Sequence, residues 1–240
     1  MLVLDQVHAH YGSAHVLQGI SLEVQPGQIA CLIGRNGAGK STTLKAIMGV
    51  IKPSAGSITF KGELISGWPP HKIAAQGLAW VPEDRRIFAS LSVEENIRVA
   101  AQAMSGSSRR RAAAALAIFP DLQTRAKQRG GSLSGGQQQM LSIARALASS
   151  PDLILLDEPS EGLSPVMVAT IRAGILESRA RGVSILLVEQ NLALALAVAE
   201  VFFVLSRGLV VHRASRAQIL SDPSFVTKHL GVSAIRATSR

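Results

Sequence analysis

One stretch near the start of the chain decides the fold: Gly34-Arg35-Asn36-Gly37-Ala38-Gly39-Lys40-Ser41-Thr42. It has the spacing Gly-x-x-x-x-Gly-Lys-Ser, an apolar run over residues 29–33 precedes it, and apolar residues at helical spacing follow it up to Gly49. A strand, a glycine loop and a helix in this order predict a phosphate-binding loop. The glycines let backbone amides turn toward phosphate oxygens, and the helix N-terminus adds a partial positive charge.

Two side chains of this loop and two further along are predicted to act on a nucleotide. Lys40 is expected to reach the β- and γ-phosphates, and Ser41 to ligate Mg²⁺. The apolar run over residues 153–156 leads into Asp157 and Glu158, and a strand would deliver both to the carboxyl edge of the sheet, where ligands bind in this architecture. We expect Asp157 to hold Mg²⁺ through water and Glu158 to orient and polarise the attacking water.

The hydrophobic pattern predicts strands on both sides of the loop. Residues 2–7 and 16–24 alternate with a period of two. The other predicted strands cover residues 29–33, 57–61, 78–81, 153–156, 183–188 and 201–205. Buried strands that alternate with helices, one of them beginning at Ser164-Pro165, imply a mainly parallel sheet covered on both faces.

A helical insert separates the two strand-rich parts. Ser92-Val93-Glu94-Glu95 matches a capping box, so a helix should start there. Two helical stretches, separated by residues 105–108, run to about Gln128. We expect a helical subdomain over about residues 92–129, set between parts 1–91 and 130–240 of one larger domain.

Composition indicates a globular chain. It has 240 residues, 47% hydrophobic and 17% charged, which excludes intrinsic disorder. The longest apolar run, residues 192–206, contains Glu200 and is shorter than the roughly 20 residues of a spanning helix. The N-terminus lacks the pattern of a secretion signal. Cys31, the only cysteine, cannot form an internal disulfide, and we expect it to be a small core residue.

The net charge of +9 raises the question of nucleic-acid binding, because Lys and Arg neutralise phosphates. Only two Trp, one Tyr and six Phe are available to stack on bases. The clearest basic run, Arg109-Arg110-Arg111, opens an Ala-rich helical stretch. We therefore expect no nucleic-acid partner, and a membrane face or an acidic protein remains as a partner for the basic surface.

A third motif indicates which subclass of phosphate-binding-loop proteins the chain resembles. Leu133-Ser134-Gly135-Gly136-Gln137 opens a helix and precedes the Asp157-Glu158 strand. Together with the phosphate-binding loop it resembles the signature of ATP-binding cassette (ABC) proteins, and the resemblance covers essentially the whole chain. It implies an α/β fold, a P-loop NTPase of ABC type, with a mainly parallel sheet core, an N-terminal antiparallel β part and a helical subdomain.

The resemblance also implies further site residues. In this family two cassettes sandwich two ATP molecules, and each signature contacts the γ-phosphate held by the other subunit, which would involve Ser134, Gly135, Gly136 and Gln137. Tyr11 stands where the family has an aromatic residue stacked on adenine. The loop residues implied to bind ATP with Mg²⁺ are Gly34, Asn36, Gly37, Ala38, Gly39, Lys40, Ser41 and Thr42.

Three positions depart from the family pattern. Glu83 stands where most members carry a glutamine that senses magnesium and touches the membrane subunit, and Gln190 stands where most carry a histidine on the γ-phosphate. Ser164 stands where an aspartate usually ends the loop after the catalytic glutamate. Because Lys40 and Glu158 are present, and glutamine still donates a hydrogen bond to phosphate, we expect reduced rather than absent hydrolysis.

The combination of departures resembles one branch, the smaller ATPase subunit of branched-chain amino-acid importers. The segments that carry this resemblance begin at Val81-Pro82-Glu83, at Ser160 and at Val188-Glu189-Gln190-Asn191. The branch implies an ATP-hydrolysing subunit held peripherally at the cytoplasmic face of the inner membrane, beneath two multi-spanning permease subunits. A paralogous ATPase subunit or a second copy would complete the ATP sandwich, and a periplasmic or extracellular substrate-binding protein would supply the substrate.

Other members of the family remain as alternatives. An importer of urea or amides belongs to the same branch, although its subunits more often keep glutamine at the position of Glu83. The ATPase subunit of an exporter is disfavoured only because the three departures from the family pattern resemble the importer branch. A soluble cassette protein of translation or DNA maintenance usually carries two cassettes in one chain or a long coiled-coil insertion, and neither fits within 240 residues.

Overall fold

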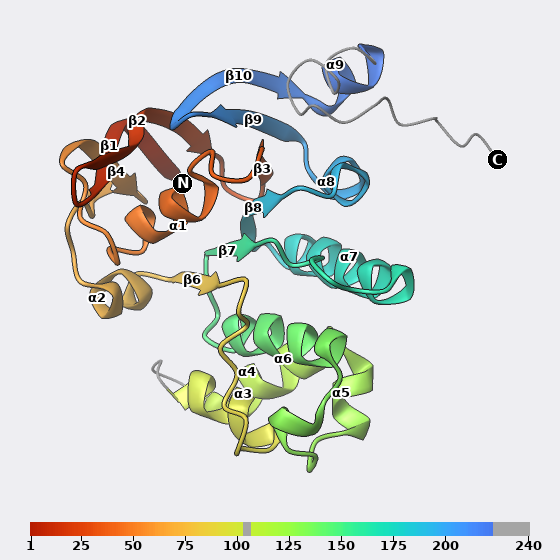
Figure 1. The fold of residues 1–240 in the computed structure, drawn as a ribbon. Helices are drawn as coiled ribbons and strands as arrows, with labels where there is room; N and C mark the ends of the chain where they lie inside the picture. Colours follow the sequence, from red (N-terminus) through yellow and green to blue (C-terminus); the bar gives the residue numbers. More distant parts are fainter. Residues whose placement is uncertain (103–106, 223–240) are drawn as a thin grey trace.

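A mainly parallel sheet forms the centre of the molecule, which the computed structural model describes over residues 1–102 and 107–222 (Figure 1). Its strand order is β10-β9-β3-β8-β7-β6. Neighbouring strands are parallel except β9 and β10, which are antiparallel. The predicted parallel core is therefore confirmed. The strands are β3 (Ile29–Gly34), β6 (Leu78–Val81), β7 (Leu153–Asp157), β8 (Ser184–Glu189), β9 (Val201–Ser206) and β10 (Leu209–Ser215).

A second, antiparallel sheet comes from the N-terminal part of the chain, as expected. Its order is β2-β1-β4-β5. The first strand continues beyond the predicted end at residue 7, because Gln6 adopts a φ of 47° and shifts the register, so that pairing persists where the alternation of the sequence breaks. The strands are β1 (Leu2–Tyr11), β2 (Ala14–Val24), β4 (Ala55–Phe60) and β5 (Glu63–Leu64).

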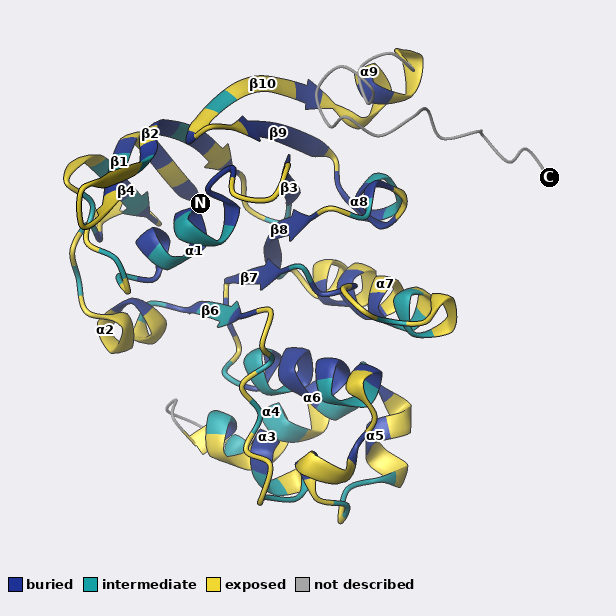
Figure 2. Ribbon diagram, in the orientation of Figure 1, coloured by how far each residue is buried: buried dark blue, intermediate teal, exposed yellow. Residues whose placement is uncertain are grey.

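The strand β3 contributes to two hydrophobic cores. Side chains of a strand point alternately to opposite faces. Cys31 and its odd-numbered neighbours pack with α6, α7 and α8, whereas Leu32 and Ala30 pack with α1 and the antiparallel sheet. Every residue of β3 is buried, and the central strands form the most buried part of the ribbon (Figure 2). This burial on both faces fixes the strand that leads into the phosphate-binding loop.

The helices cover both faces of the sheet, and α3 to α6 form the lower body in Figure 1. The insert contains three helices among the described residues rather than the two predicted, because Phe119 is not helical and Pro120 after it begins a separate helix. Residues 105 and 106 of the predicted break lie outside the described residues, and Ser107 caps α4, which begins at Ser108. The helices are α1 (Lys40–Ile47), α2 (Pro70–Ala75), α3 (Val93–Gln102), α4 (Ser108–Leu116), α5 (Pro120–Thr124), α6 (Gly135–Leu147), α7 (Pro165–Ala180), α8 (Leu192–Val198) and α9 (Arg216–Ser221).

Two predicted helix starts are confirmed by their hydrogen bonds. The Ser92 backbone N–H donates to Glu95 Oε2 over 2.8 Å, and the Glu95 N–H donates to Ser92 Oγ over 3.2 Å. The Ser92 hydroxyl also donates to Glu95 Oε2 over 2.8 Å, and the two bonds that Ser92 donates to this carboxylate lower the pKa of Glu95. At the start of α7, Ser164 Oγ accepts from the Met167 N–H over 3.4 Å. Serine therefore still caps α7 where the family usually has aspartate.

The long apolar run near residue 200 is divided between two elements. Its first part forms α8 and its second part forms β9, with Glu200 between them in an ion pair to Arg179 over 2.5 Å. Among the described residues, no helix has both the length and the apolar character that crossing a membrane requires.

Candidate functional site

Four neighbouring strands end at one edge of the large sheet. In the order β3, β8, β7 and β6 these strands are parallel neighbours, so their carboxyl ends point the same way. The phosphate-binding loop follows β3, Gln190 follows β8, Glu158 follows β7 and Glu83 lies just beyond β6. The topology thus brings together residues that are up to 150 positions apart in the sequence (Gln190 to Lys40).

The phosphate-binding loop has a backbone that only small residues permit. A Cβ atom on Gly34 would lie 2.4 Å from the Leu205 carbonyl oxygen of β9. Gly39, which precedes α1, has a φ of 111°, a conformation that favours glycine. The loop therefore passes directly into the N-terminus of α1, whose free backbone N–H groups provide an anion site.

Lys40 and Glu158 form an ion pair in the centre of the site. Lys40 Nζ lies 3.2 Å from Glu158 Oε1 and donates to the Gly34 carbonyl oxygen over 3.0 Å, and its side chain is 4% exposed. Gln190 Nε2 donates to the other oxygen of Glu158 over 2.5 Å. Glu158 itself has a φ of 47°, which is strained for a residue with a side chain. Both groups that hold the Glu158 carboxylate are donors that a phosphate group would also attract.

Ser41 and Asp157 provide oxygen atoms suited to magnesium. Ser41 Oγ donates to Asp157 Oδ1 over 3.1 Å, and neighbouring ligands on octahedral Mg²⁺ are separated by about 3.0 Å when each bond is about 2.1 Å. Among the described residues, no group of three or more His, Cys, Asp or Glu could hold a metal ion. Ser41 and Asp157 would supply two of the ligands of a Mg²⁺ ion whose other ligands are phosphate oxygens and water.

Burial raises the pKa of Asp157 to about 6, and the nearby carboxylates of Glu158 and Glu83 add to this, whereas the Ser41 hydroxyl and Lys40 oppose it. A carboxylate that is ionised at neutral pH therefore costs the folded chain free energy until a cation binds. Most of this cost comes from the burial of the Asp157 carboxylate, and the nearby carboxylates of Glu158 and Glu83 add to it.

Asp157→Asn is expected to stabilise the chain, without nucleotide or Mg²⁺, by about 1–3 kcal/mol near pH 7.5. The pKa of Asp157 is about 6 in the folded chain, above the ordinary value of 3.8, so the folded state binds the proton more tightly. As the pH falls from about 6 toward 4, folded Asp157 becomes protonated first, and the advantage of asparagine disappears. Urea unfolding near pH 7.5 and near pH 4.5 measures the change.

Asp152→Asn provides the control, because Asp152 is 49% exposed and paired with Lys61. Its substitution is expected to give no gain near neutral pH. A gain for Asp157→Asn that is equal at both pH values, or no gain at all, contradicts the prediction.

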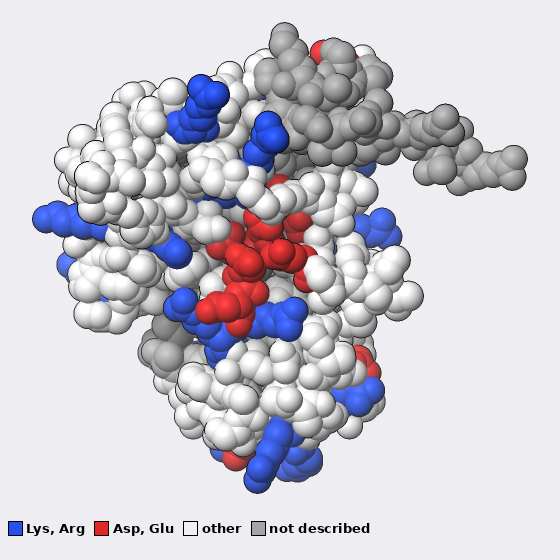
Figure 3. All heavy atoms as spheres, in the orientation of Figure 1, with Lys and Arg blue, Asp and Glu red and all other residues white. Residues whose placement is uncertain are grey.

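A cavity of about 470 Å³ lies over these residues. Figure 3 shows acidic side chains concentrated in the middle of this face, with Lys and Arg side chains around them. Most of the predicted site residues line the cavity, and two further residues, Val16 and Glu161, join them. The lining residues are Val16, Asn36, Gly37, Gly39, Lys40, Ser41, Thr42, Glu83, Glu158, Glu161 and Gln190.

Glu161 and Val16 were not identified from the sequence. Glu161 lies only three residues beyond Glu158 in the sequence, and this short separation could have identified it as a site residue. Its carboxylate faces Glu83, whose pKa is raised by burial first and by Glu161 next. Val16 lies on β2 of the other sheet, and nothing in its apolar character indicated a site.

The remaining predicted residues do not line this cavity. Tyr11 ends β1 and is exposed, whereas Gly34 and Ala38 are buried residues of the phosphate-binding loop. Asp157 lines a neighbouring cavity with Ser41 and Glu83. Ser134 caps α6 in a capping box with Gln137. In the first turn of this helix Gly135 is exposed and Gly136 is buried, and neither lines the cavity over the chain's own phosphate-binding loop.

Comparisons with known proteins agree on one family. The family model described as ABC transporter matches residues 17–161. The high-affinity branched-chain amino acid transport ATP-binding protein BraG of Pseudomonas aeruginosa is 42% identical, covering 96% of this chain and 100% of BraG. The probable branched-chain amino acid transport protein LivF of Archaeoglobus fulgidus is 35% identical, over 97% and 99% of the two chains. The lipopolysaccharide export protein LptB of Escherichia coli is 34% identical, over 92% and 93%.

Solved structures give the same fold. A nucleotide-free ATP-binding cassette from an ABC transporter superposes with a TM-score of 0.84 at 25% identity, over 97% of this chain and 99% of that chain. The ATP-binding subunit of an ABC transporter superposes with a TM-score of 0.81 at 31% identity, over 97% and 95%. The predicted fold class is therefore confirmed.

Proposed function

The chain belongs to the ABC transporter family as an ATPase subunit, and on this premise we propose that it drives the import of branched-chain amino acids. The observation that supports ATP hydrolysis by this chain is the convergence of Lys40, Glu158 and Gln190 at one cavity, with Glu83 beside them. The similarity to BraG and LivF supports the substrate class, whereas the similarity to LptB keeps an exporter as the second candidate. An importer of urea or amides is the third.

In the proposed mechanism the chain acts mainly by positioning and charge. Lys40 leaves Glu158 and binds the β- and γ-phosphates of ATP, while the N–H groups at the start of α1 bind the phosphate oxygens. Ser41 and Asp157 would hold Mg²⁺, which neutralises charge on the phosphates when it is bound. Glu158, released from Lys40, orients and polarises the attacking water, and Gln190 donates to the γ-phosphate.

The signature is proposed to act on the ATP of a second cassette. Ser134 to Gln137 form a helix N-terminus that does not line the chain's own cavity, and such a terminus suits an anion brought by another subunit. The partner would be a paralogous ATPase subunit or a second copy. Two membrane permeases beneath a substrate-binding protein would complete the transporter, with this chain at the cytoplasmic face of the membrane and Tyr11 against the adenine.

We also propose that residues 92–129 form a helical subdomain on a core made of 1–91 and 130–240. An antiparallel bridge pairs Ser92 with Arg129. On either side of it, the Val93 N–H donates to the Gln128 carbonyl over 2.9 Å and the Gly130 N–H to the Leu91 carbonyl over 2.8 Å. The insert therefore leaves and re-enters the core at one place, which supports the boundaries.

Gln190→His is expected to raise ATP turnover several-fold. A protonated histidine forms a charge-assisted hydrogen bond to phosphate, which is about twice as strong as a neutral one, whereas glutamine carries no charge. ATP turnover in the assembled transporter measures the effect. No change, or a loss of turnover, would count against a phosphate contact at this position.

Purification of the tagged chain from its own cells in mild detergent, with mass-spectrometric identification of its companions, tests the proposed function. Two multi-spanning membrane proteins and a second cassette subunit are expected, and the associated binding protein can then be tested with leucine and with urea. Binding of urea alone would move the proposal to the second importer class. Recovery of lipopolysaccharide-export components, or of ribosomes without a membrane protein, would overturn import.

A further inference from the structure

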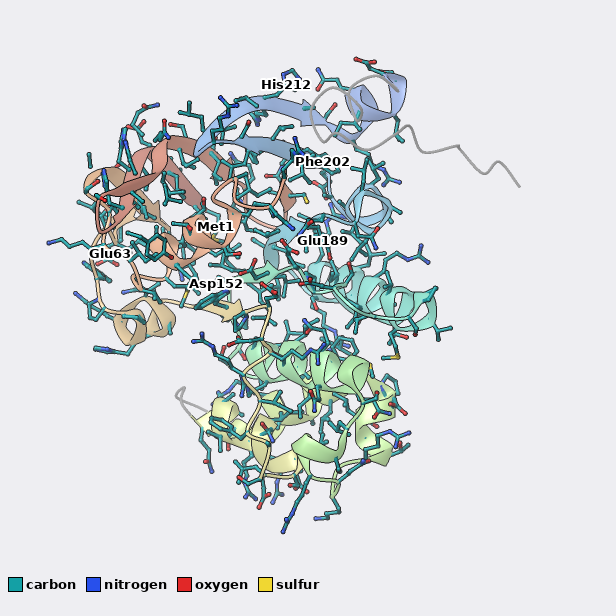
Figure 4. All side chains as sticks on the ribbon, viewed as in Figure 1. Met1, Glu63, Asp152, Glu189, Phe202 and His212 are labelled. Atoms are coloured by element: carbon teal, nitrogen blue, oxygen red, sulfur yellow. The ribbon has the colours of Figure 1, made fainter. Side chains whose placement is uncertain are left out.

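A buried carboxylate lies directly behind the residues proposed to act on ATP. Glu189 ends β8 (Figure 4) and is 2% exposed. It does not line the nucleotide cavity. Burial raises its pKa, and hydrogen bonds from Ser160 and the following backbone oppose this effect. Burying a carboxyl group costs free energy unless hydrogen bonds compensate for the lost contact with water. The contacts of Glu189 therefore indicate its role.

The carboxylate of Glu189 joins two loops of the site. Oε1 accepts from the Ser160 N–H over 3.0 Å, in the loop that follows Glu158. Oε2 accepts from the N–H groups of Gln190 and Asn191 over 3.0 and 2.9 Å, in the loop that follows β8. Each oxygen thus serves one loop, and three buried or partly buried N–H groups have this single side chain as their acceptor.

The two loops also meet through the proposed site residues themselves. The Glu158 N–H donates to the Val188 carbonyl over 2.9 Å, and Gln190 Nε2 donates to Glu158 Oε2 over 2.5 Å. A movement of either loop would change both contacts. Glu189 is therefore placed to fix the relative position of the general base and the phosphate ligand.

We propose that Glu189 is a positioning residue for hydrolysis, which holds Glu158 and Gln190 in register through the backbone N–H groups of Ser160 and Gln190. The inference rests on the roles proposed for Glu158 and Gln190. A carboxylate suits this task because it accepts on both oxygens, whereas an amide has one acceptor and would turn an NH₂ group against an N–H donor.

Glu189→Gln tests the proposal in the full chain. Its kcat for ATP is expected to fall about 10-fold, because small displacements of reacting groups have large effects on rate. Its KM for ATP should stay within about two-fold, since Glu189 does not line the cavity. Rates are normalised to the folded fraction measured by circular dichroism. Glu200→Gln is the matched control, because Glu200 is 42% exposed in an ion pair at the opposite end of the sheet, before β9, and its kcat should not change.

A double-mutant cycle separates positioning from general loss of structure. The fall caused by Glu189→Gln is expected to be smaller in a Gln190→Ala background, because part of the effect passes through Gln190. An equal fall in both backgrounds, a rise in KM without a fall in kcat, or an unchanged kcat overturns the proposal.

Glu189→Asp keeps the test decisive if Glu189→Gln fails to fold. Aspartate retains both acceptor oxygens but withdraws them by one methylene group, so kcat should fall with KM unchanged, and an unaltered kcat overturns the proposal. Glu158→Gln, measured in parallel, distinguishes the two levels of inference. Full turnover of Glu158→Gln would contradict the proposed function itself. If Glu158→Gln loses turnover while both Glu189 variants keep a normal kcat, only the role proposed for Glu189 is contradicted.

Discussion

Glu158→Gln is expected to bind ATP normally and to lose turnover by roughly 100-fold or more, the usual contribution of a general base. Glutamine has nearly the same shape and can keep a contact with Lys40 through its remaining oxygen, but it cannot accept a proton from water. The Glu158 carboxylate is the acidic group that contacts both Lys40 and Gln190 in the site. Fluorescent-nucleotide binding and phosphate release measure the two properties separately.

The matched control is Glu161→Gln, because Glu161 lines the same cavity but is exposed and faces Glu83 instead of Lys40. It should leave turnover within about two-fold of the unsubstituted chain. Unchanged turnover in Glu158→Gln, measured in the assembled transporter, would remove Glu158 from the mechanism.

Lys40→Met is expected to weaken ATP binding by about 10- to 100-fold, which corresponds to the loss of a charged hydrogen bond worth about 1.5–3 kcal/mol. Turnover should also be lost, because no other cation of the phosphate-binding loop lies in this cavity. Methionine preserves most of the length and the apolar packing of the lysine side chain. Titration with ATP and Mg²⁺, followed by calorimetry, measures the affinity.

Lys52→Met, on an exposed position after α1, is the control and should bind ATP normally. Equal affinity of Lys40→Met and the unsubstituted chain would show that the backbone N–H groups suffice to hold the phosphates. In that case the ion pair between Lys40 and Glu158 would be structural only.

The parts of the fold that the sequence predicted are those whose residues interact locally or are buried on both faces. The loop from Gly34 to Lys40, the capping box at Ser92 and the buried strand before Asp157 each have such a signature. The predicted strands of the central sheet were found at nearly the same positions.

The elements that were missed are short or exposed. The strand β5 has two residues, and α2 and α9 have six each, which is too short for a helical period to repeat. The strand β10 is largely exposed, so its pattern is weak. The capping box of Ser215 and Gln218 at α9 was a usable signal that the prediction did not include.

The site was predictable in its residue types but not in its contacts. The sequence indicated Lys40, Glu158 and Gln190 separately, through motifs. The ion pair between Lys40 and Glu158 and the bonds of Glu189 depend on strand order, because β8 lies between β3 and β7. No local pattern reports which strands become neighbours.

The position of β3 also has a consequence for synthesis of the chain on the ribosome. β3 emerges early, yet its two neighbours in the sheet, β8 and β9, begin at Ser184 and Val201. A nascent chain that has already exposed the phosphate-binding loop can cover one face of β3 with α1 and the antiparallel sheet, but the strand has neither of its neighbours in the large sheet. Glu158 and Gln190, which follow β7 and β8, also join the loop at this edge of the sheet only after those strands have been made. The sheet that holds the phosphate-binding loop is therefore completed only in the last part of translation, after residues 184–206 have been made.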